Sequence, residues 1–124
     1  MVTDQTIGES TTHLSADDLA ALRENLHEQR LFRQEQLRQL AGPATSRAED
    51  RNRRQTAAQA EVRVKLAASA RMVLADVEAA LTRMRQGSYG TCQLCRRPVD
   101  RQRLMIVPQA RYCARCQQVK EALP

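Results

Sequence analysis

The chain has 124 residues, with two Tyr, one Phe and no Trp, and its apolar residues are mostly Ala and Leu. A chain this short buries a modest fraction of its surface, and the scarcity of aromatic side chains limits its core further. The composition suits long helices and argues against a β-sandwich or barrel. A bound metal is one way to hold a small region of such a chain together.

The net charge of +6 is unevenly placed, with −3 on residues 1–46, +4 on residues 47–86 and +5 on residues 87–124. A basic C-terminal part can attract nucleic acid or an acidic protein surface, and charge alone does not choose between them. The chain start lacks the basic and apolar regions of a signal peptide, and no apolar run approaches the roughly 20 residues of a membrane span. We therefore expect a cytoplasmic protein without a membrane partner, in a compartment that disfavours disulfides.

Residues 1–14 are rich in Ser and Thr and are expected to form a disordered tail. A capping box, Ser15 followed by Asp18, predicts that a helix begins at about Ala16, with Leu14 as a hydrophobic staple. Five leucines mark its apolar contacts: Leu19, Leu22, Leu26, Leu37 and Leu40. The Gly-Pro pair at positions 42–43 predicts the end of this helix, since proline cannot continue it.

A second capping box, Ser46 followed by Glu49, predicts a helix from Arg47 to about Gln86, where Gly87 ends it. Apolar residues recur at spacings of four and three along it, as in a heptad seam. They are Leu66, Ala70, Val73, Val77, Ala80 and Met84.

The short linker predicts an all-α fold in which residues 15–86 form a long antiparallel helical hairpin, a coiled coil with its tip at residues 41–54. The apolar content lies toward the base of this hairpin, which suits an element that projects from the molecule. A parallel homodimeric coiled coil is the alternative. The Gly-Pro break and the two separate capping boxes favour the hairpin, and we expect a monomer.

The four cysteines are spaced C-x-x-C, seventeen residues, C-x-x-C, which is typical of a zinc site. Cys92, Cys95, Cys113 and Cys116 would complete the tetrahedron of thiolates that zinc prefers. Four protein ligands leave no position for water, so we expect one structural Zn2+. Two disulfides or a redox-active dithiol are the alternatives, and the expected compartment and the absence of a βαβ pattern disfavour them. The only histidines, His13 and His27, are expected to be solvated.

The stretch GSYGTCQLCRRPVDRQRLMIVPQARYCARC resembles the four-cysteine zinc finger of the DksA/TraR family of transcription regulators. Five residues around the cysteines carry the resemblance: Tyr89, Gly90, Arg103, Leu104 and Pro108. The resemblance implies a zinc finger in residues 87–124, with a terminal helix starting near Cys113. It also implies RNA polymerase as partner, with the finger on its surface, the hairpin in its secondary channel, and ppGpp as a further candidate partner.

The hairpin tip departs from the DksA pattern of two aspartates three residues apart followed by Ala. Asp50 matches the second aspartate, while Arg47 and Asn52 replace the first aspartate and the Ala. Glu49 and Asp50 are therefore candidates to act near the polymerase active site, or are acids favoured by the start of a helix.

The basic residues of the finger are candidates for a docking cluster, namely Arg96, Arg97, Arg101 and Arg103. Ordinary solvation of the finger is the alternative reading of these side chains. A DNA-binding finger with GATA-like spacing is the alternative function, but it leaves the hairpin unexplained, so sequence-specific DNA binding is not expected. The sequence has no nucleophile set, phosphate loop or open metal site, so we do not expect an enzyme.

Overall fold

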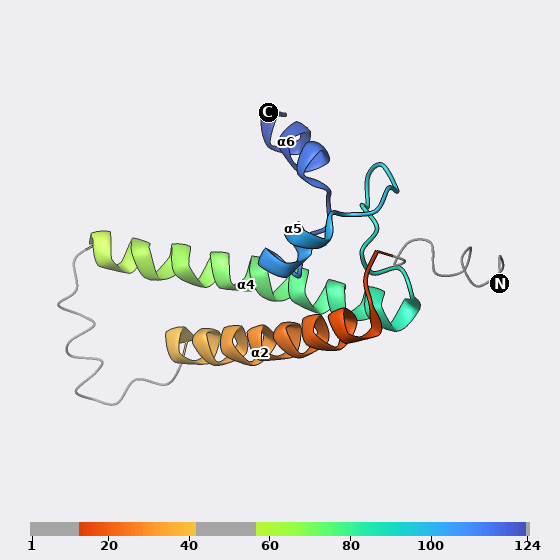
Figure 1. The fold of residues 1–124 in the computed structure, drawn as a ribbon. Helices are drawn as coiled ribbons and strands as arrows, with labels where there is room; N and C mark the ends of the chain where they lie inside the picture. Colours follow the sequence, from red (N-terminus) through yellow and green to blue (C-terminus); the bar gives the residue numbers. More distant parts are fainter. Residues whose placement is uncertain (1–12, 42–56, 124) are drawn as a thin grey trace, which may run out of the picture.

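The structure is a computed structural model, and it describes residues 13–41 and 57–123. Within these ranges the chain forms the helices α2 (Ala16–Ala41), α4 (Ala57–Gln86), α5 (Arg101–Ile106) and α6 (Ala114–Ala122). α2 and α4 pack antiparallel, and the chain after α4 returns over the base of this hairpin before α6 points away from it (Figure 1). The expected all-α hairpin with a C-terminal finger is confirmed. No helix in the described ranges has the length and apolar character to cross a bilayer.

The start of α2 is fixed by the predicted capping box. The amide of Asp18 donates to Ser15 Oγ at 2.9 Å, and the amide of Ser15 donates to Asp18 Oδ2 at 3.1 Å. Leu14, just before the cap, is buried and lies in one core cluster with Leu19. The staple and the cap together set the direction in which the chain enters α2.

The end of α4 is a Schellman motif around Gly87. This glycine has φ +79°, its amide donates to Met84 O at 3.3 Å, and the next amide, of Ser88, donates to Arg83 O at 2.9 Å. A residue with a Cβ would be strained in this left-handed conformation, so the predicted glycine stop is confirmed with its physical cause.

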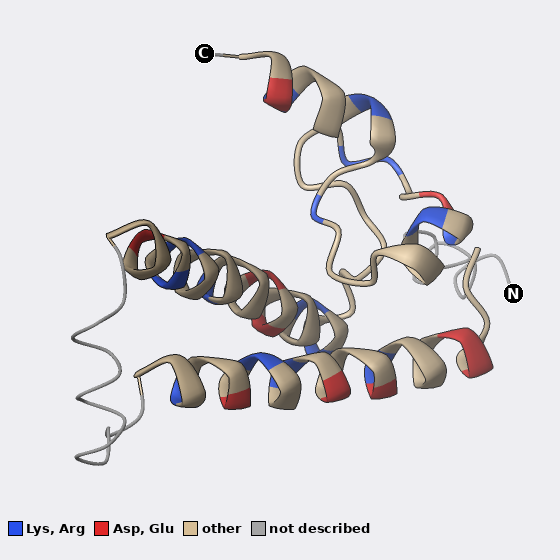
Figure 2. Cartoon of the chain, turned by 90° about the vertical axis from the view of Figure 1, so that its left-hand side faces the viewer, with Lys and Arg blue, Asp and Glu red and all other residues tan. Residues whose placement is uncertain are grey.

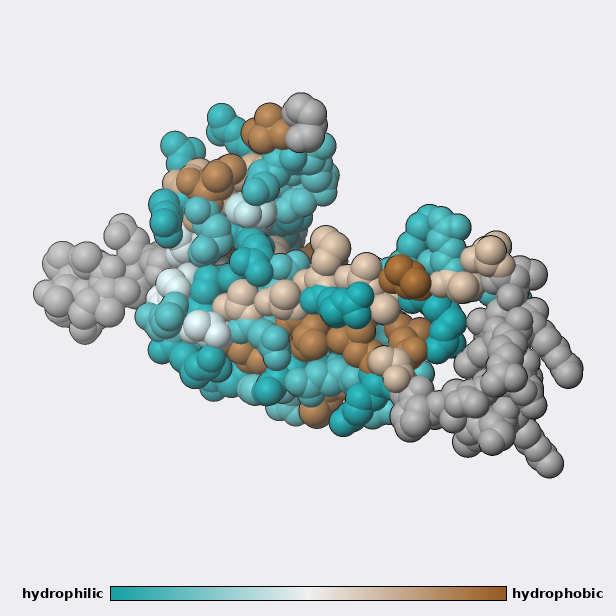
Figure 3. Space-filling model, turned by 180° about the vertical axis from the view of Figure 1, so that it is seen from behind, coloured by the Kyte–Doolittle hydropathy of each residue, from teal (hydrophilic) through white to brown (hydrophobic). Residues whose placement is uncertain are grey.

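The hairpin core lies at its base, as the apolar pattern predicts. From α2, Leu22 and Leu26 are buried, and they share one cluster with the seam residues Val77 and Ala80 of α4. The seam loosens away from the base, where Leu66 is 46% exposed. Seen from behind, apolar residues gather along the line between the two helices (Figure 3).

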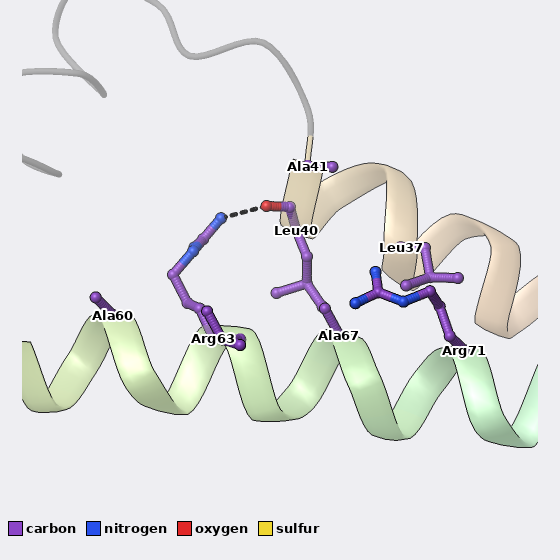
Figure 4. A pocket seen from close by; sticks show the side chains of 8 residues that line it. Leu37, Leu40, Ala41, Ala60, Arg63, Ala67 and Arg71 are labelled. Atoms are coloured by element: carbon purple, nitrogen blue, oxygen red, sulfur yellow. Dashed lines mark hydrogen bonds between the residues drawn. The ribbon is translucent and has the colours of Figure 1, made fainter.

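The far end of the described hairpin is held by an arginine that crosses between the helices. Arg63 of α4 donates to Leu40 O, in the last turn of α2, at 2.7 Å (Figure 4). A cation at a helix C-terminus satisfies an unpaired carbonyl and complements the helix dipole. Beside this contact lies an open hollow of about 500 Å³ between the two helices, lined in part by Leu37 and Ala67.

One predicted helix boundary lies outside the described residues, and one observed helix was not expected. The described part of the second helix begins at Ala57, while its predicted start at Arg47 and the second capping box lie outside the described residues. Of the expected tip at residues 41–54, only Ala41 is described, as the last residue of α2. α5 was not expected, because six residues are too few to show a helical period. α6 begins directly after Cys113, where the terminal helix was expected.

Candidate metal centre

The first knuckle is a tight antiparallel turn that carries Cys92 and Cys95. Gly90, with φ +91°, accepts from the amide of Val99 at 2.7 Å, and the amide of Cys92 donates to Arg97 O at 2.8 Å. Inside the turn, the amide of Leu94 donates to Cys92 Sγ at 3.4 Å. The backbone bonds close the turn, and the amide inside it stabilises negative charge on the sulfur.

The second knuckle uses a ligand as a helix cap. Cys113 is the N-cap of α6, its Sγ accepts from the amide of Cys116 at 3.5 Å, and its carbonyl accepts from the amide of Gln117 at 2.9 Å. The positive end of the helix dipole and the unpaired amides favour a thiolate at this position. The amide of Gln93 donates to Arg111 O at 2.8 Å, which ties the first knuckle to the segment that leads into the second.

The four cysteines meet at one point, and none forms a disulfide in the part of the chain that the structure describes. Their sulfurs all lie within 4.8 Å of one another, and the Sγ atoms of Cys95 and Cys113 are 3.9 Å apart. A tetrahedron with Zn–S bonds of about 2.3 Å has edges of about 3.8 Å. These four residues form a C4 zinc-binding site. With four thiolate ligands, a bound zinc ion would cross-link the two knuckles and leave no open position for catalysis.

The thiols differ in how easily they lose their protons. Burial opposes ionisation of Cys92, but hydrogen bonds from the backbone amides of Cys95, Cys113 and Leu94 lower its pKa to about 6. Burial and hydrogen bonds with the neighbouring sulfurs raise the pKa of Cys116 to about 12. A bound zinc ion would remove this difference, because each of the four thiols would coordinate it as a thiolate.

The segment between the knuckles is held by donors that reach alternate carbonyls. The Tyr89 hydroxyl donates to Pro108 O at 2.8 Å, the Arg83 guanidinium to Ala110 O at 3.3 Å, and the Arg103 guanidinium to Tyr112 O at 3.0 Å. Tyr89 and Arg83 are 1% and 7% exposed, and burial raises the pKa of the first and lowers that of the second. These contacts, together with fully buried Leu104, fix the backbone that presents Cys113.

Two ion pairs join the finger to the hairpin. The Arg101 guanidinium makes two bonds of 2.9 Å to the carboxylate of Asp18, the capping residue of α2. The Arg111 guanidinium bonds to Asp76 of α4 at 2.6 Å. The hydrogen bond from Arg101, with those from Ser15, holds the pKa of Asp18 well below its usual range.

The expectation that His13 is solvated was wrong. His13 is partly buried, and its Nε2 lies 2.6 Å from Val99 O in the finger. His13 and Leu14 therefore pack at the joint between hairpin and finger, and the remainder of the expected tail, residues 1–12, lies outside the described residues. His27 is exposed on α2, as expected.

The candidate docking cluster divides into two pairs. Arg96 and Arg97 are exposed in the first knuckle, whereas Arg101 and Arg103 are occupied with Asp18 and with a backbone carbonyl of the finger. The tip candidates Glu49 and Asp50 lie outside the described residues. Three residues that hold the finger were not expected to do so, namely Asp18, Asp76 and Arg83. The sequence marks Asp18 only as a helix cap and gives no sign that Asp76 and Arg83 contact the finger.

The comparisons with known proteins agree with this geometry. Residues 87–122 match the family model described as Prokaryotic dksA/traR C4-type zinc finger. The finger is of the DksA/TraR type. An uncharacterized protein of Aquifex aeolicus (strain VF5) is 37% identical over 43 residues, which are 35% of this chain and 30% of that protein. The match thus spans less than a third of that relative's length.

Among solved structures, transcription factor DksA2 from Pseudomonas aeruginosa is similar in fold to almost the whole chain. The similarity covers 86% of this chain and 85% of that chain, with a TM-score of 0.61 and 25% sequence identity. The resemblance to the DksA/TraR family is thereby confirmed for the finger and for the arrangement of the hairpin on it. Tyr89 and Arg103, two of the residues that carry the resemblance, each donate to a backbone carbonyl of the finger.

Proposed function

We propose that this protein regulates transcription initiation by binding RNA polymerase, with its finger on the polymerase surface and its hairpin in the secondary channel. One observation carries the proposal: a narrow two-helix hairpin projects from a zinc finger in the arrangement of the transcription factor DksA2 (Figure 1). Each helix is about 10 Å across, so the pair suits a channel. The fold and finger support a regulatory protein of the cytoplasm and give no support to an enzyme.

The contacts at the base of the hairpin support an arm that enters the channel in a fixed orientation relative to the finger. Asp18 with Arg101, and Asp76 with Arg111, attach the finger to both helices, so the two parts would move as one. A finger held in this way on a partner surface would aim the hairpin in one direction. We propose that Glu49 and Asp50 then act near the catalytic metal of the polymerase, where carboxylates can perturb a metal-centred site. The nucleotide ppGpp stays a candidate co-regulator.

Docking is assigned to the exposed basic residues of the first knuckle, Arg96 and Arg97. They are free to meet an acidic surface, and exposed charges act chiefly on the association rate and its salt dependence. Arg101 and Arg103 stabilise the fold, so a charge reversal at Arg101 would loosen the joint with Asp18 as well as change the surface charge.

The test is co-purification of the tagged full-length chain with RNA polymerase, beside a promoter-DNA gel shift at the same stated salt. A photo-crosslinking residue at exposed Val62, on the hairpin arm, should capture a polymerase subunit. The same residue at exposed Leu123, beyond α6, serves as the comparison for a site outside the hairpin.

The outcomes separate three functions. Polymerase retention with crosslinking from Val62 supports the proposal. DNA retention without polymerase would establish the alternative of a DNA-binding finger, to which the basic C-terminal part is also suited. Self-association without either partner would make the hairpin a structural coiled coil.

A further inference from the structure

A cavity of about 400 Å³ lies directly against the metal centre. Its lining combines three of the four zinc ligands with two arginines and a proline, namely Cys95, Cys113, Cys116, Arg97, Arg115 and Pro98. The arginines come from the two different knuckles, since Arg97 follows Cys95 and Arg115 lies in the first turn of α6. Figure 2 shows basic segments both in the finger loop and at the start of α6, on the same part of the finger.

These two arginines differ from most others in the finger. Arg101, Arg103 and Arg111 each bind a carboxylate or a backbone carbonyl. By contrast, the guanidinium groups of Arg97 and Arg115 form no hydrogen bond or ion pair among the residues described in the structure. No carboxylate lines the cavity that they share with the ligands.

The two arginines and the metal centre carry opposite charges. Four thiolates around one divalent ion carry a net charge of −2, and the two exposed arginines that line the same cavity carry +2. Opposite charges that line one cleft attract each other, and salt weakens the attraction because the two arginines are exposed. Residues that hydrogen-bond to the ligands of a metal site typically alter metal affinity by about 10- to 100-fold, and we expect two charges acting without such bonds to lie at the lower end of this range.

We propose that Arg97 and Arg115 are positioning residues that compensate the charge of the zinc–thiolate centre and thereby slow the release of zinc. Each would stabilise the negatively charged zinc–thiolate centre relative to the state in which a sulfur has left the metal. The role is independent of any partner of the protein, so it stands or falls separately from polymerase binding.

The test measures the rate of zinc release from the zinc-loaded full-length chain. The coloured zinc indicator 4-(2-pyridylazo)resorcinol is used at concentrations where the rate no longer depends on it, so that its own approach does not enter. Arg97→Gln together with Arg115→Gln should release zinc about 10-fold faster at low salt. The difference should shrink in about 0.5 M salt, because salt screens exposed charges.

Matched variants separate charge from structure. Arg97→Lys with Arg115→Lys keeps both charges and should restore slow release. Arg96→Gln removes a charge from the same knuckle at a residue that does not line the cavity, and it should stay within about twofold of the wild type. The absorption spectrum of the cobalt-substituted protein should be the same in all variants, since the tetrahedron of sulfurs is unchanged.

Three results on zinc release would overturn the proposal. They are release from the double Gln variant within twofold of the wild type, an equal effect of Arg96→Gln, and failure of the Lys variants to restore slow release. A changed cobalt spectrum in the double Gln variant would also overturn it, because the arginines would then shape the site rather than compensate its charge.

Discussion

Removing one hydroxyl group should weaken zinc binding without touching a ligand. Tyr89 is 1% exposed, and its hydroxyl donates to Pro108 O at 2.8 Å. Tyr89→Phe keeps the ring and its packing but leaves this carbonyl without its donor in a buried place. The bond fixes the segment that leads to Cys113, so its loss should make the second knuckle less ordered.

The magnitude follows from the burial of both partners. An acceptor left unsatisfied in the interior costs about 1–3 kcal/mol, and the cavity left by one oxygen adds little. Because finger folding and zinc binding are coupled, a cost of about 1.5 kcal/mol should appear as roughly tenfold weaker zinc binding. The hairpin should keep its helicity, since its own core at Leu22, Leu26 and Val77 is unaffected.

The assay is a competition titration of zinc between the protein and a chelator of known affinity, with circular dichroism for the hairpin. The chain offers a matched control in its other tyrosine. Tyr112 is partly buried, its ring lies 5.0 Å from the ammonium of Lys120, and no hydrogen bond of its hydroxyl is found among the described residues. Tyr112→Phe should change zinc affinity by less than about twofold. Equal affinities of the two Phe variants would refute the reasoning that the buried bond orders the finger.

Four further predictions concern separate parts of the molecule. Among the described residues Arg96 is the one non-glycine with positive φ, at 65°, so Arg96→Gly should be more stable than Arg96→Ala by about 1 kcal/mol in thermal unfolding, and equal stability would contradict the strain. Cys113→Ser should lose zinc yet keep a helix cap, whereas Cys113→Ala should lose both, as metal analysis and helicity would report. The pKa of Asp18 is lower in the folded chain than in the unfolded chain, so its carboxylate stabilises the fold above the unfolded-state pKa and loses this effect only as the pH falls through the folded-state pKa. Asp18→Asn should therefore lower the stability equally at about pH 6 and about pH 8, and a clear difference between the two would contradict this. Glu49→Gln with Asp50→Asn should cost less than about 1 kcal/mol and spare polymerase binding but abolish the effect on promoter-complex decay; unchanged decay would make these acids helix caps only.

The elements that could be predicted from the sequence depend on neighbours along the chain. The capping box of Ser15 and Asp18, and the left-handed stop at Gly87, involve residues within a few positions of one another. The two C-x-x-C turns are equally local, and the preference of zinc for four thiolates is strong enough to identify the ligands from spacing alone. The heptad seam located the hairpin core because burial follows the helical period.

What the sequence could not decide depends on contacts between distant residues. The partners Asp18 and Arg101 are 83 positions apart, and His13 and Val99 are 86 apart. The sequence does not show which arginine of the finger binds a carboxylate and which lines a cavity, because all of them have the same local propensity. The tertiary structure separates Arg101, which is bound to the hairpin, from Arg97, which lines a cavity together with three of the cysteines. The chain alone thus determined the helices, the stops and the zinc ligands, while packing between hairpin and finger decided the role of each charged residue around them.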